Sequence, residues 1–257
     1  MKTPVIEFVD ADIPRGRASS RATLLQGVSW RVDPGDFWVV GGMAGRGKTD
    51  LLCTAAALQR PVKGYHSIFG KDTQGMDEQD LVTSHRKVAM VFDSGRLFPN
   101  LSVAENLALP LAYHQASQRE VADRVARVLE ATRLQAFRDR RPGEITRNLH
   151  QRVGLARALA LNPEALLIDS PLLGIDQRQC RWWLEFLRQL NQGHAVCDQR
   201  PLTIIASTDD FRPWTEVAKC FAVIKETAFQ VVGGRAEMQS TSESAVQEMI
   251  APSFESD

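Results

Sequence analysis

A glycine-rich segment between two apolar runs places the strongest constraint on how this chain can fold. The segment GMAGRGKT (residues 42–49) follows the run FWVV and overlaps the start of KTDLLCTAAALQR, which is rich in Leu and Ala. The first run predicts a buried strand and the second a helix. Glycines at such a junction let backbone N–H groups surround a phosphate, and the helix N-terminus adds positive charge. The order of strand, glycine loop and helix therefore predicts an α/β fold with a phosphate-binding loop.

The segment matches the pattern G-x-x-x-x-G-K-[ST] at every position. In this pattern Lys48 bridges the β- and γ-phosphates of a nucleotide, and the Thr49 hydroxyl ligates Mg²⁺. A purely structural glycine turn is the alternative, but it would not need a strand before it and a helix after it. We therefore expect ATP and Mg²⁺ as cofactors. The residues expected to hold ATP are Gly42, Met43, Ala44, Gly45, Arg46, Gly47, Lys48, Thr49 and Asp50.

Three further apolar runs predict strands of a parallel sheet that is buried on both faces. They are KVAMVF (residues 87–92), ALLIDS (165–170) and LTIIAST (202–208). Asp169 lies at the end of the second run, where its carboxylate can act as a second partner of Mg²⁺, through water. Asp93 directly follows the first run and could also touch the metal. Nearer the N-terminus, Pro34-Gly35 separates two strand-like runs and predicts an antiparallel hairpin at the sheet edge.

Composition narrows the possible classes of protein. The 257 residues are 44% hydrophobic and 24% charged, as in soluble globular domains, and 31 basic residues balance 31 acidic ones. This balance argues against nucleic acid as a partner. No segment is apolar enough to insert into a membrane, and four scattered cysteines indicate reduced thiols in the cytoplasm. The segment STSESAVQEMIAPSFESD at the C-terminus is expected to be a surface tail with one short amphipathic turn.

Five landmarks, in order, make the chain resemble the ATP-binding subunits of ABC transporters from about Val5 to about Gly234. They are GGMAGRGKT (Walker A), VAMVFDSGRLFPNLSVAENLALPL (the Q-loop region), PGEITRNLHQRVGLARALALNP (the signature helix), ALLIDSPLLGID (Walker B and D-loop) and TIIASTDD (H-loop). The resemblance implies an α/β P-loop NTPase (RecA-like) core with a mixed, mainly parallel sheet, an N-terminal antiparallel β subdomain and an inserted α-helical subdomain. It places the ATP-binding domain at residues 1–240, the helical subdomain at about 96–153, and a tail at 241–257.

Within this family, the segment FDSGRLFPNLSVAENLALPL looks most like the ATPases of MCE-type (Mla-like) phospholipid transport systems. A lipoprotein-release or amino-acid-importer relative would share much of it. The resemblance implies an integral membrane permease as partner, bound through the helical subdomain near Phe98, and a homo- or heterodimer of ATP-binding subunits. It also implies a cytoplasmic protein held at the inner face of the plasma membrane by that permease.

The chain departs from the family pattern where ATP is hydrolysed. Ser170 stands at the place of the glutamate that acts as base, Asp93 replaces the Q-loop glutamine, and Thr208 replaces the H-loop histidine. A serine hydroxyl cannot hold a proton taken from water near neutral pH. The residues that match the Leu-Ser-Gly-Gly-Gln signature are Ile145, Thr146, Arg147, Asn148 and Leu149. Both glycines of the signature are therefore lost, so we expect ATP binding with impaired hydrolysis and assign no catalytic residue.

Two interpretations of these losses stay open. The chain is either an ABC transporter subunit with weak hydrolysis or a non-hydrolysing, ATP-sensing pseudoenzyme that regulates or assembles a membrane complex. Compensation is a further alternative, with Asp93, Asp209 or Asp210 as substitute bases. A guanine-reading N-K-x-D motif is absent from the sequence, which argues against a P-loop GTPase. No aromatic residue marks an adenine-stacking position near Arg15, which could itself stack on the base.

Overall fold

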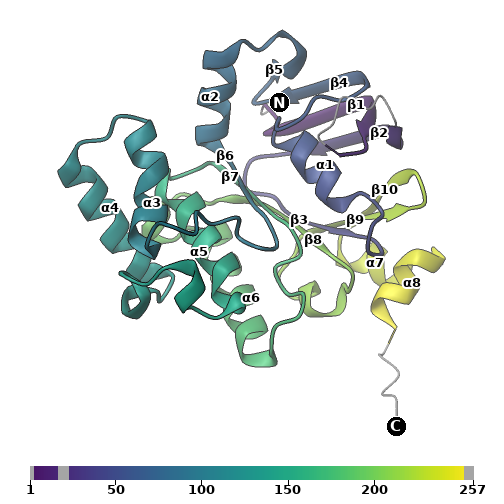
Figure 1. Ribbon diagram of the computed structural model, residues 1–257. Coiled ribbons are helices and arrows are strands. Elements are labelled where there is room, and N and C mark those ends of the chain that lie inside the picture. Colours follow the sequence, from purple (N-terminus) through teal and green to yellow (C-terminus); the bar gives the residue numbers. More distant parts are fainter. Residues whose placement is uncertain (1–2, 17–22, 252–257) are drawn as a thin grey trace.

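The computed structural model describes residues 3–16 and 23–251. A ten-stranded sheet with the order β5-β4-β1-β2-β10-β9-β3-β8-β7-β6 runs through the molecule (Figure 1). The strands are β1 (Ile6–Pro14), β2 (Thr23–Val32), β3 (Phe37–Gly41), β4 (Lys63–Ile68), β5 (Lys71–Asp72), β6 (Val88–Val91), β7 (Ala165–Ile168), β8 (Thr203–Thr208), β9 (Cys220–Lys225) and β10 (Ala228–Gly233). The helices are α1 (Lys48–Ala55), α2 (Glu78–Lys87), α3 (Val103–Tyr113), α4 (Gln118–Ala131), α5 (Arg147–Ala160), α6 (Gln177–Gln192), α7 (Arg235–Ser240) and α8 (Ser244–Ile250).

The sheet has an antiparallel part and a parallel part. Strand β1 pairs with both β2 and β4 in antiparallel register. Strands β9, β3, β8, β7 and β6 are all mutually parallel. Strand β10 joins the two parts, because it pairs antiparallel with β9 and meets β2 at Ala228 and Gln26. The mixed sheet, the N-terminal antiparallel strands and the helical subdomain agree with the predicted fold class.

The central parallel strands are apolar because both of their faces are covered. Every residue of β3, β7 and β8 is buried, and the ALLI sequence of β7 has no exposed surface. Short, mainly apolar runs such as ALLI in β7 and TIIAST in β8 are typical of parallel strands that are covered on both faces. The three strands predicted from the runs at residues 87–92, 165–170 and 202–208 are β6, β7 and β8.

The predicted hairpin at Pro34-Gly35 is wrong. Strands β2 and β3 flank this turn but do not pair with each other; β2 pairs with β1 and β10, and β3 with β8 and β9. The turn instead carries the chain from the antiparallel part into the parallel part. Asn191 of α6 donates to the carbonyl oxygen of Gly35 at 3.1 Å and fixes the crossing. Burial of all five residues of β3 demands a central position, which a hairpin partner at the sheet edge could not supply.

Helices α3, α4 and α5 pack together and form the helical subdomain at one side of the sheet (Figure 1). Capping boxes start α3 at Ser102 with Glu105 and α4 at Ser117 with Glu120. The apolar stripe of α4 packs inward, with Val125, Val128 and Leu129 buried. Helix α5 contacts both α3 and α4 and continues toward the sheet.

A buried arginine ties these helices to α6. Arg124 of α4 donates to the carbonyl oxygens of Leu159, Ala160 and Val196 at 2.5, 3.0 and 2.7 Å. The first two carbonyls end α5, and the third lies in the loop after α6. Burial lowers the pKa of Arg124 from its ordinary value. One side chain therefore sets the relative positions of α4, α5 and the loop that follows α6.

The C-terminal segment is more ordered than the expected surface tail. Val246 and Met249 of α8 are buried and belong to the main hydrophobic core. Met249 also packs against Gly41 at the end of β3, where an added Cβ would come within 2.4 Å of the Met249 methyl carbon. The expected amphipathic turn corresponds to α8. The expectation that residues 244–250 form a surface tail is wrong, because α8 covers the end of the strand that leads into the phosphate loop.

The antiparallel part contains a buried histidine whose titration should change stability. His66 stacks on Phe8 with ring centroids 4.3 Å apart, and its Nδ1 lies 3.0 Å from the Thr73 hydroxyl. Burial lowers the pKa of His66 from 6.5 to about 4. Between these two pH values, His66 is protonated in the unfolded chain and neutral in the folded protein. The stability from this site is complete above about pH 6.5 and is lost as the pH falls toward 4.

We expect His66→Gln, which keeps a polar group near Thr73, to flatten the acid side of the stability profile. Wild type should lose about 3 kcal/mol more than the variant between neutral pH and pH 4. Urea unfolding of both proteins at several pH values measures the difference. Parallel profiles for the two proteins would show that His66 does not titrate in this way.

Candidate phosphate-binding site

The parallel sheet brings the predicted site segments to one edge. Gly41 pairs with Thr208, and the Gly42 N–H donates to the Thr208 carbonyl oxygen at 3.2 Å. Ile168 pairs with Val91 on one side and with Ala206 on the other. The segments that follow β3, β8, β7 and β6 therefore lie next to one another. These are the phosphate loop, the H-loop, Walker B and the Q-loop.

The loop conformation depends on glycine at two positions. Gly45 and Gly47 have φ angles of 75° and 95°, in the left-handed region that side chains rarely adopt. A Cβ on Gly47 would also lie 2.6 Å from the Leu24 Cδ2 atom. Gly47 directly precedes α1, and its carbonyl accepts from the Leu51 N–H at 2.9 Å. The motif glycines thus supply the backbone shape, and α1 begins at Lys48 as predicted from the sequence.

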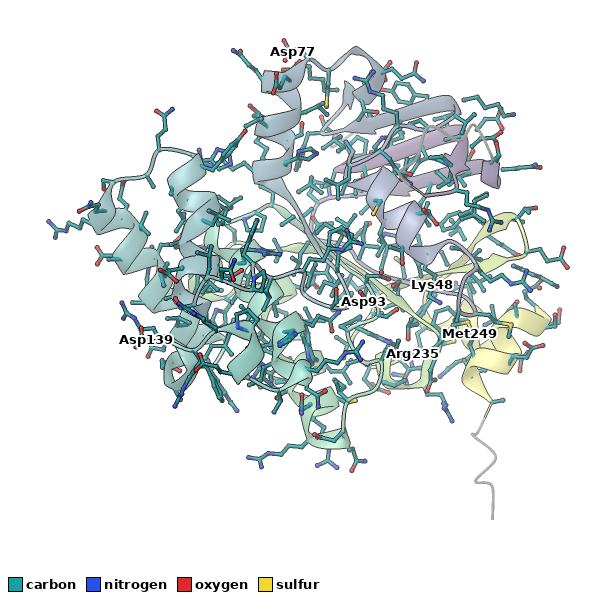
Figure 2. The ribbon with its side chains drawn as sticks, in the orientation of Figure 1. Lys48, Asp77, Asp93, Asp139, Arg235 and Met249 are labelled. Carbon is teal, nitrogen blue, oxygen red and sulfur yellow. The ribbon has the colours of Figure 1, made fainter. Side chains whose placement is uncertain are left out.

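The Lys48 side chain turns into the loop. Its ammonium donates to the carbonyl oxygens of Gly42 and Met43, the latter at 3.1 Å, and the residue is 8% exposed. Burial lowers the pKa of Lys48, and the nearby carboxylates of Asp209 and Asp169 oppose that shift. A buried ammonium held only by carbonyls gains strongly from a phosphate beside it. The position of Lys48 therefore suits recognition of an anion at the loop (Figure 2).

Thr49 and Asp169 form a pair of oxygen ligands suited to Mg²⁺. The Thr49 hydroxyl donates to Asp169 Oδ2 at 2.6 Å, and the Ser207 hydroxyl donates to Oδ1 at 2.7 Å. The Asp169 carbonyl accepts from the Gln151 side chain at 2.7 Å. Mg²⁺ favours a few oxygen ligands from protein and completes its shell with phosphates and water. Thr49 would hold the ion, with Asp169 beside it, and the ion would neutralise phosphate charge.

Ser170 sits in a constrained turn at the predicted position of the base. Its φ angle is 47°, and its N–H donates to the Ser207 hydroxyl at 2.9 Å. The two hydroxyl oxygens of Ser170 and Ser207 are 3.4 Å apart. The hydroxyl of Ser170 therefore faces another hydroxyl, and neither group can act as a base near neutral pH.

The Thr208 hydroxyl is fully engaged within its own loop. It donates to the Asp210 carbonyl at 2.9 Å and accepts from the Asp210 N–H at 3.1 Å. The Trp214 indole N–H also donates to it, at 3.2 Å. These bonds fold the H-loop onto the turn at Arg212–Trp214. Thr208 is thus held as a structural group, in contrast to a side chain free to reach a γ-phosphate.

The three candidate substitute carboxylates occupy different environments. Asp210 forms an ion pair with Arg212, whose Nη2 is 2.7 Å from Oδ2. Asp93 is exposed and accepts the Ser94 N–H at 2.7 Å. Asp209 lines the hollow beside the phosphate loop. Of the three, Asp209 is the one that lines this hollow and that acts electrostatically on Lys48, and its role as a base stays a hypothesis.

The signature-equivalent residues lie on the surface at the start of α5. Thr146, Arg147 and Asn148 are exposed, whereas Ile145 and Leu149 are half-buried. Thr146 occupies the N-cap position without a side-chain capping bond. No hydrogen bond joins these five residues to the phosphate loop within residues 3–16 and 23–251. The fold therefore leaves them accessible to another chain.

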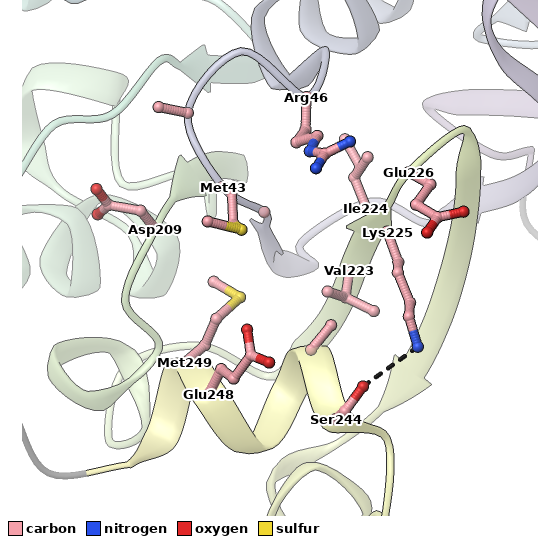
Figure 3. A pocket seen from close by; sticks show the side chains of 13 residues that line it. Met43, Arg46, Asp209, Val223, Ile224, Lys225, Glu226, Ser244, Glu248 and Met249 are labelled. Atoms are coloured by element: carbon pink, nitrogen blue, oxygen red, sulfur yellow. Dashed lines mark hydrogen bonds between the residues drawn. The ribbon is translucent and has the colours of Figure 1, made fainter.

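A hollow of about 480 Å³ separates the phosphate loop from α8 (Figure 3). Met43 and Arg46 enter it from the loop, and Met249 faces Met43 from α8. Asp50, expected to bind nucleotide, accepts the Gly16 N–H at 2.8 Å and so anchors the segment after β1. Arg15 is exposed in that segment, and the described residues place no ring beside it.

Sequence reasoning missed two residues that position Asp169. Ser207 is buried in β8 and holds both the carboxylate of Asp169 and the N–H of Ser170. Gln151 is buried in α5 and holds the Asp169 carbonyl. A buried polar residue needs a partner, and the place of Ser207 in a strand predicted to be buried on both faces could have singled it out. Gln151 gave no comparable signal, because one face of a helix is normally polar.

Comparison with protein families assigns the class. Residues 25–173 match the family model described as ABC transporter, so the chain belongs to this family. Curated relatives include methionine import ATP-binding proteins MetN, 33% identical over 214 residues in Cupriavidus metallidurans and 31% identical over 227 residues in Bifidobacterium longum. The matches cover 83% and 87% of this chain but only 60% and 55% of those proteins. The chain thus spans little more than half the length of these relatives.

Solved structures share the fold. A dimeric bacterial ABC transporter cassette, MJ0796, aligns with a TM-score of 0.76 and 25% identity over 87% of this chain and 95% of that chain. CbiO1 of Clostridium perfringens, part of the ABC transporter complex CbiONQ, aligns with a TM-score of 0.78 and 18% identity, over 94% and 93% of the two chains. The chain is therefore an ABC transporter ATP-binding cassette in family and in fold.

Proposed function

We propose that this cassette binds Mg-ATP with ordinary strength but hydrolyses it slowly. The observation that carries this proposal is Ser170 at the base position beside a complete phosphate loop and the Thr49–Asp169 pair. Loss of a general base lowers the rate of ATP hydrolysis about 10²–10⁴-fold. Nucleotide binding, which needs only the loop and the metal ligands, does not depend on that base. In this account ATP drives association of two cassettes, which moves a membrane permease.

The dimer should place the signature-equivalent residues over the nucleotide of the opposing subunit. Arg147 and Asn148 are exposed at the start of α5 and add bulk where the family has glycine. In a homodimer, both sites would combine a missing base with an altered signature. In a heterodimer with an intact relative, one site would lack the base and the other the signature. Neither arrangement contains a complete site.

The finer proposal for the substrate is a phospholipid, by resemblance of the segment FDSGRLFPNLSVAENLALPL to MCE-type transport ATPases. The methionine importers among the relatives favour a second candidate, import of an amino acid. The two candidates differ in their permease. Co-expression of this chain with an MCE-system permease and, separately, with a methionine permease distinguishes them, because only the true partner should copurify in a fixed ratio.

No helix in residues 3–16 and 23–251 is both long and apolar enough to cross a membrane. We propose that the permease holds the chain at the inner face of the plasma membrane through the helical subdomain.

A hollow of about 280 Å³ lies between β6, α3 and α5, lined by Phe92, Pro110 and Gly154 among others. Phe98, on the loop leading to α3, is 51% exposed and lies outside this lining.

Phe98→Ala is expected to weaken copurification with the permease at least about tenfold, since a buried aromatic anchor contributes about 2 kcal/mol or more to an interface. Its affinity for Mg-ATP should be unchanged. Tyr113→Ala, which removes another exposed aromatic ring at the end of α3, is the matched control. A fall in ATP affinity of Phe98→Ala would count against its placement at the permease contact.

The main alternative is an ATP-sensing pseudoenzyme that assembles or regulates a membrane complex. Steady-state phosphate release, with and without the permease, separates the two functions. Release that the permease stimulates and that Lys48→Ala abolishes would support a slow transporter ATPase. ATP-dependent association without release would support the pseudoenzyme.

A further inference from the structure

A second hollow, lined by cations, lies between the end of α4 and the outer face of α6. Its volume is about 480 Å³, and no residue of the phosphate loop lines it. Arg133 enters from the turn after α4, and Arg178 and Arg181 enter from the first two turns of α6. All three arginines are exposed, so their guanidinium groups are accessible to a solute.

An aromatic stack forms one wall of this hollow. The Arg152 guanidinium lies over the Trp182 ring at 3.6 Å. Trp182 stacks on Phe186 with centroids 5.1 Å apart, and Phe186 meets the His194 ring edge to face at 5.5 Å. The stack holds α5, α6 and the loop after α6 together. It therefore gives the cations a rigid support, and a fourth guanidinium, that of Arg152, lies against the Trp182 ring.

The positive charge of this cluster is not neutralised by ion pairs. Within residues 3–16 and 23–251, none of Arg133, Arg152, Arg178 and Arg181 forms an ion pair. The one carboxylate in the lining, that of Glu185, forms an ion pair with Arg188, with Oε1 and Nη2 2.8 Å apart.

Two further observations concern the charges around the hollow. The carboxylate of Asp176, which lies near Arg178, accepts the Gln179 N–H at 2.9 Å and caps α6. The pKa of Arg152 is lowered, first by burial and then by repulsion from Arg133. The protein as a whole carries no net charge, so this local excess of cations is not part of a generally basic surface.

We propose that this arginine pocket, formed by Arg133, Arg178 and Arg181, binds a soluble anion that carries two or more phosphate groups. Guanidinium groups bind phosphate oxygens in a bidentate manner, and several unpaired ones in one hollow match several negative charges. The faces of the Trp182 ring are in contact with Arg152 and Phe186. The pocket therefore recognises the charge of the ligand and does not require a nucleotide base that stacks on Trp182. The site is separate from the phosphate loop and does not depend on ATP binding there.

Inorganic pyrophosphate is the probe, titrated by calorimetry into the full chain. The phosphate loop can also take pyrophosphate, so the titration is done in Lys48→Ala, where that site is impaired. We expect saturable binding, which Arg133→Gln and Arg181→Gln each weaken about tenfold or more, since a hydrogen bond to a charged group contributes about 1.5–3 kcal/mol. Arg119→Gln removes another exposed positive charge, from α4 outside the pocket, and should leave the affinity unchanged.

Thermal unfolding gives an independent readout. Without anion, Arg133→Gln should melt at or above the temperature of wild type, because it relieves repulsion with Arg152. With pyrophosphate, wild type should be stabilised more than the variant. A lipid headgroup is the other source of paired phosphates, and vesicles of phosphatidylcholine with cardiolipin test it. Binding to these vesicles but not to pyrophosphate would contradict the proposal of a soluble ligand. Absence of binding in Lys48→Ala, or equal weakening by Arg119→Gln, would overturn the pocket itself.

Discussion

Ser170→Glu is expected to raise steady-state phosphate release about 10²-fold over wild type, because it restores a general base at the end of β7. The position is suited to this exchange, since the backbone of residue 170 is fixed by its bond to the Ser207 hydroxyl, independently of its own side chain. We expect the lower end of the range for a general base because the signature-equivalent residues and Thr208 are still altered.

The matched control is Ser170→Gln, which has the length of glutamate but cannot accept a proton near neutral pH. Glutamine should leave the rate at the wild-type value. Equal rates for the two variants would contradict the view that the missing base limits hydrolysis. Wild-type release at the rate of ordinary transporters would contradict it more directly, and Asp209 would then be the acid to replace next.

Lys48→Ala is expected to weaken binding of Mg-ATP about 10²-fold or more. The ammonium lies inside the loop with carbonyls as its only hydrogen-bond partners among the described residues, and charge-assisted bonds to phosphate contribute up to about 3 kcal/mol. Calorimetric titration measures the loss. The variant should fold normally, because the substitution removes a buried charge whose pKa burial already lowers.

Lys225→Ala is the control for this experiment. Lys225 lines the hollow beside the phosphate loop (Figure 3). It also forms an ion pair with Glu243 at 2.8 Å. The Lys225→Ala substitution removes one positive charge close to the phosphate loop but changes no residue of the loop. Equal losses in both variants would indicate that general positive charge attracts the nucleotide, which is not what the geometry of Lys48 predicts.

The sequence was informative where one physical demand fixes both residue type and place. The ALLI run of β7 could only be a strand covered on both faces, and the glycines at positions 45 and 47 could only serve a loop with positive φ angles. Parallel strands that end together then bring Asp169 to Thr49. These local signals were enough for the fold class and for the pairing of the loop with Walker B.

Local signals failed where the outcome depends on distant partners. Pro34-Gly35 predicts a turn but not the strands that pair with β3. Those strands are β8 and β9. Helix α8 is short and lies in a polar C-terminal segment, yet two of its apolar residues complete the core beneath the phosphate loop. The orientation of the Thr208 hydroxyl depends on Trp214, six residues further along the chain, which no motif connects to it.

The central claim is that the site binds ATP and hydrolyses it only slowly. Its most direct test is to incubate the purified chain with Mg-ATP, isolate it rapidly from free nucleotide and identify what stays bound. The account predicts about one nucleotide per chain, recovered as intact ATP and missing from Lys48→Ala. Recovery of ADP, or of no nucleotide at all, would contradict it.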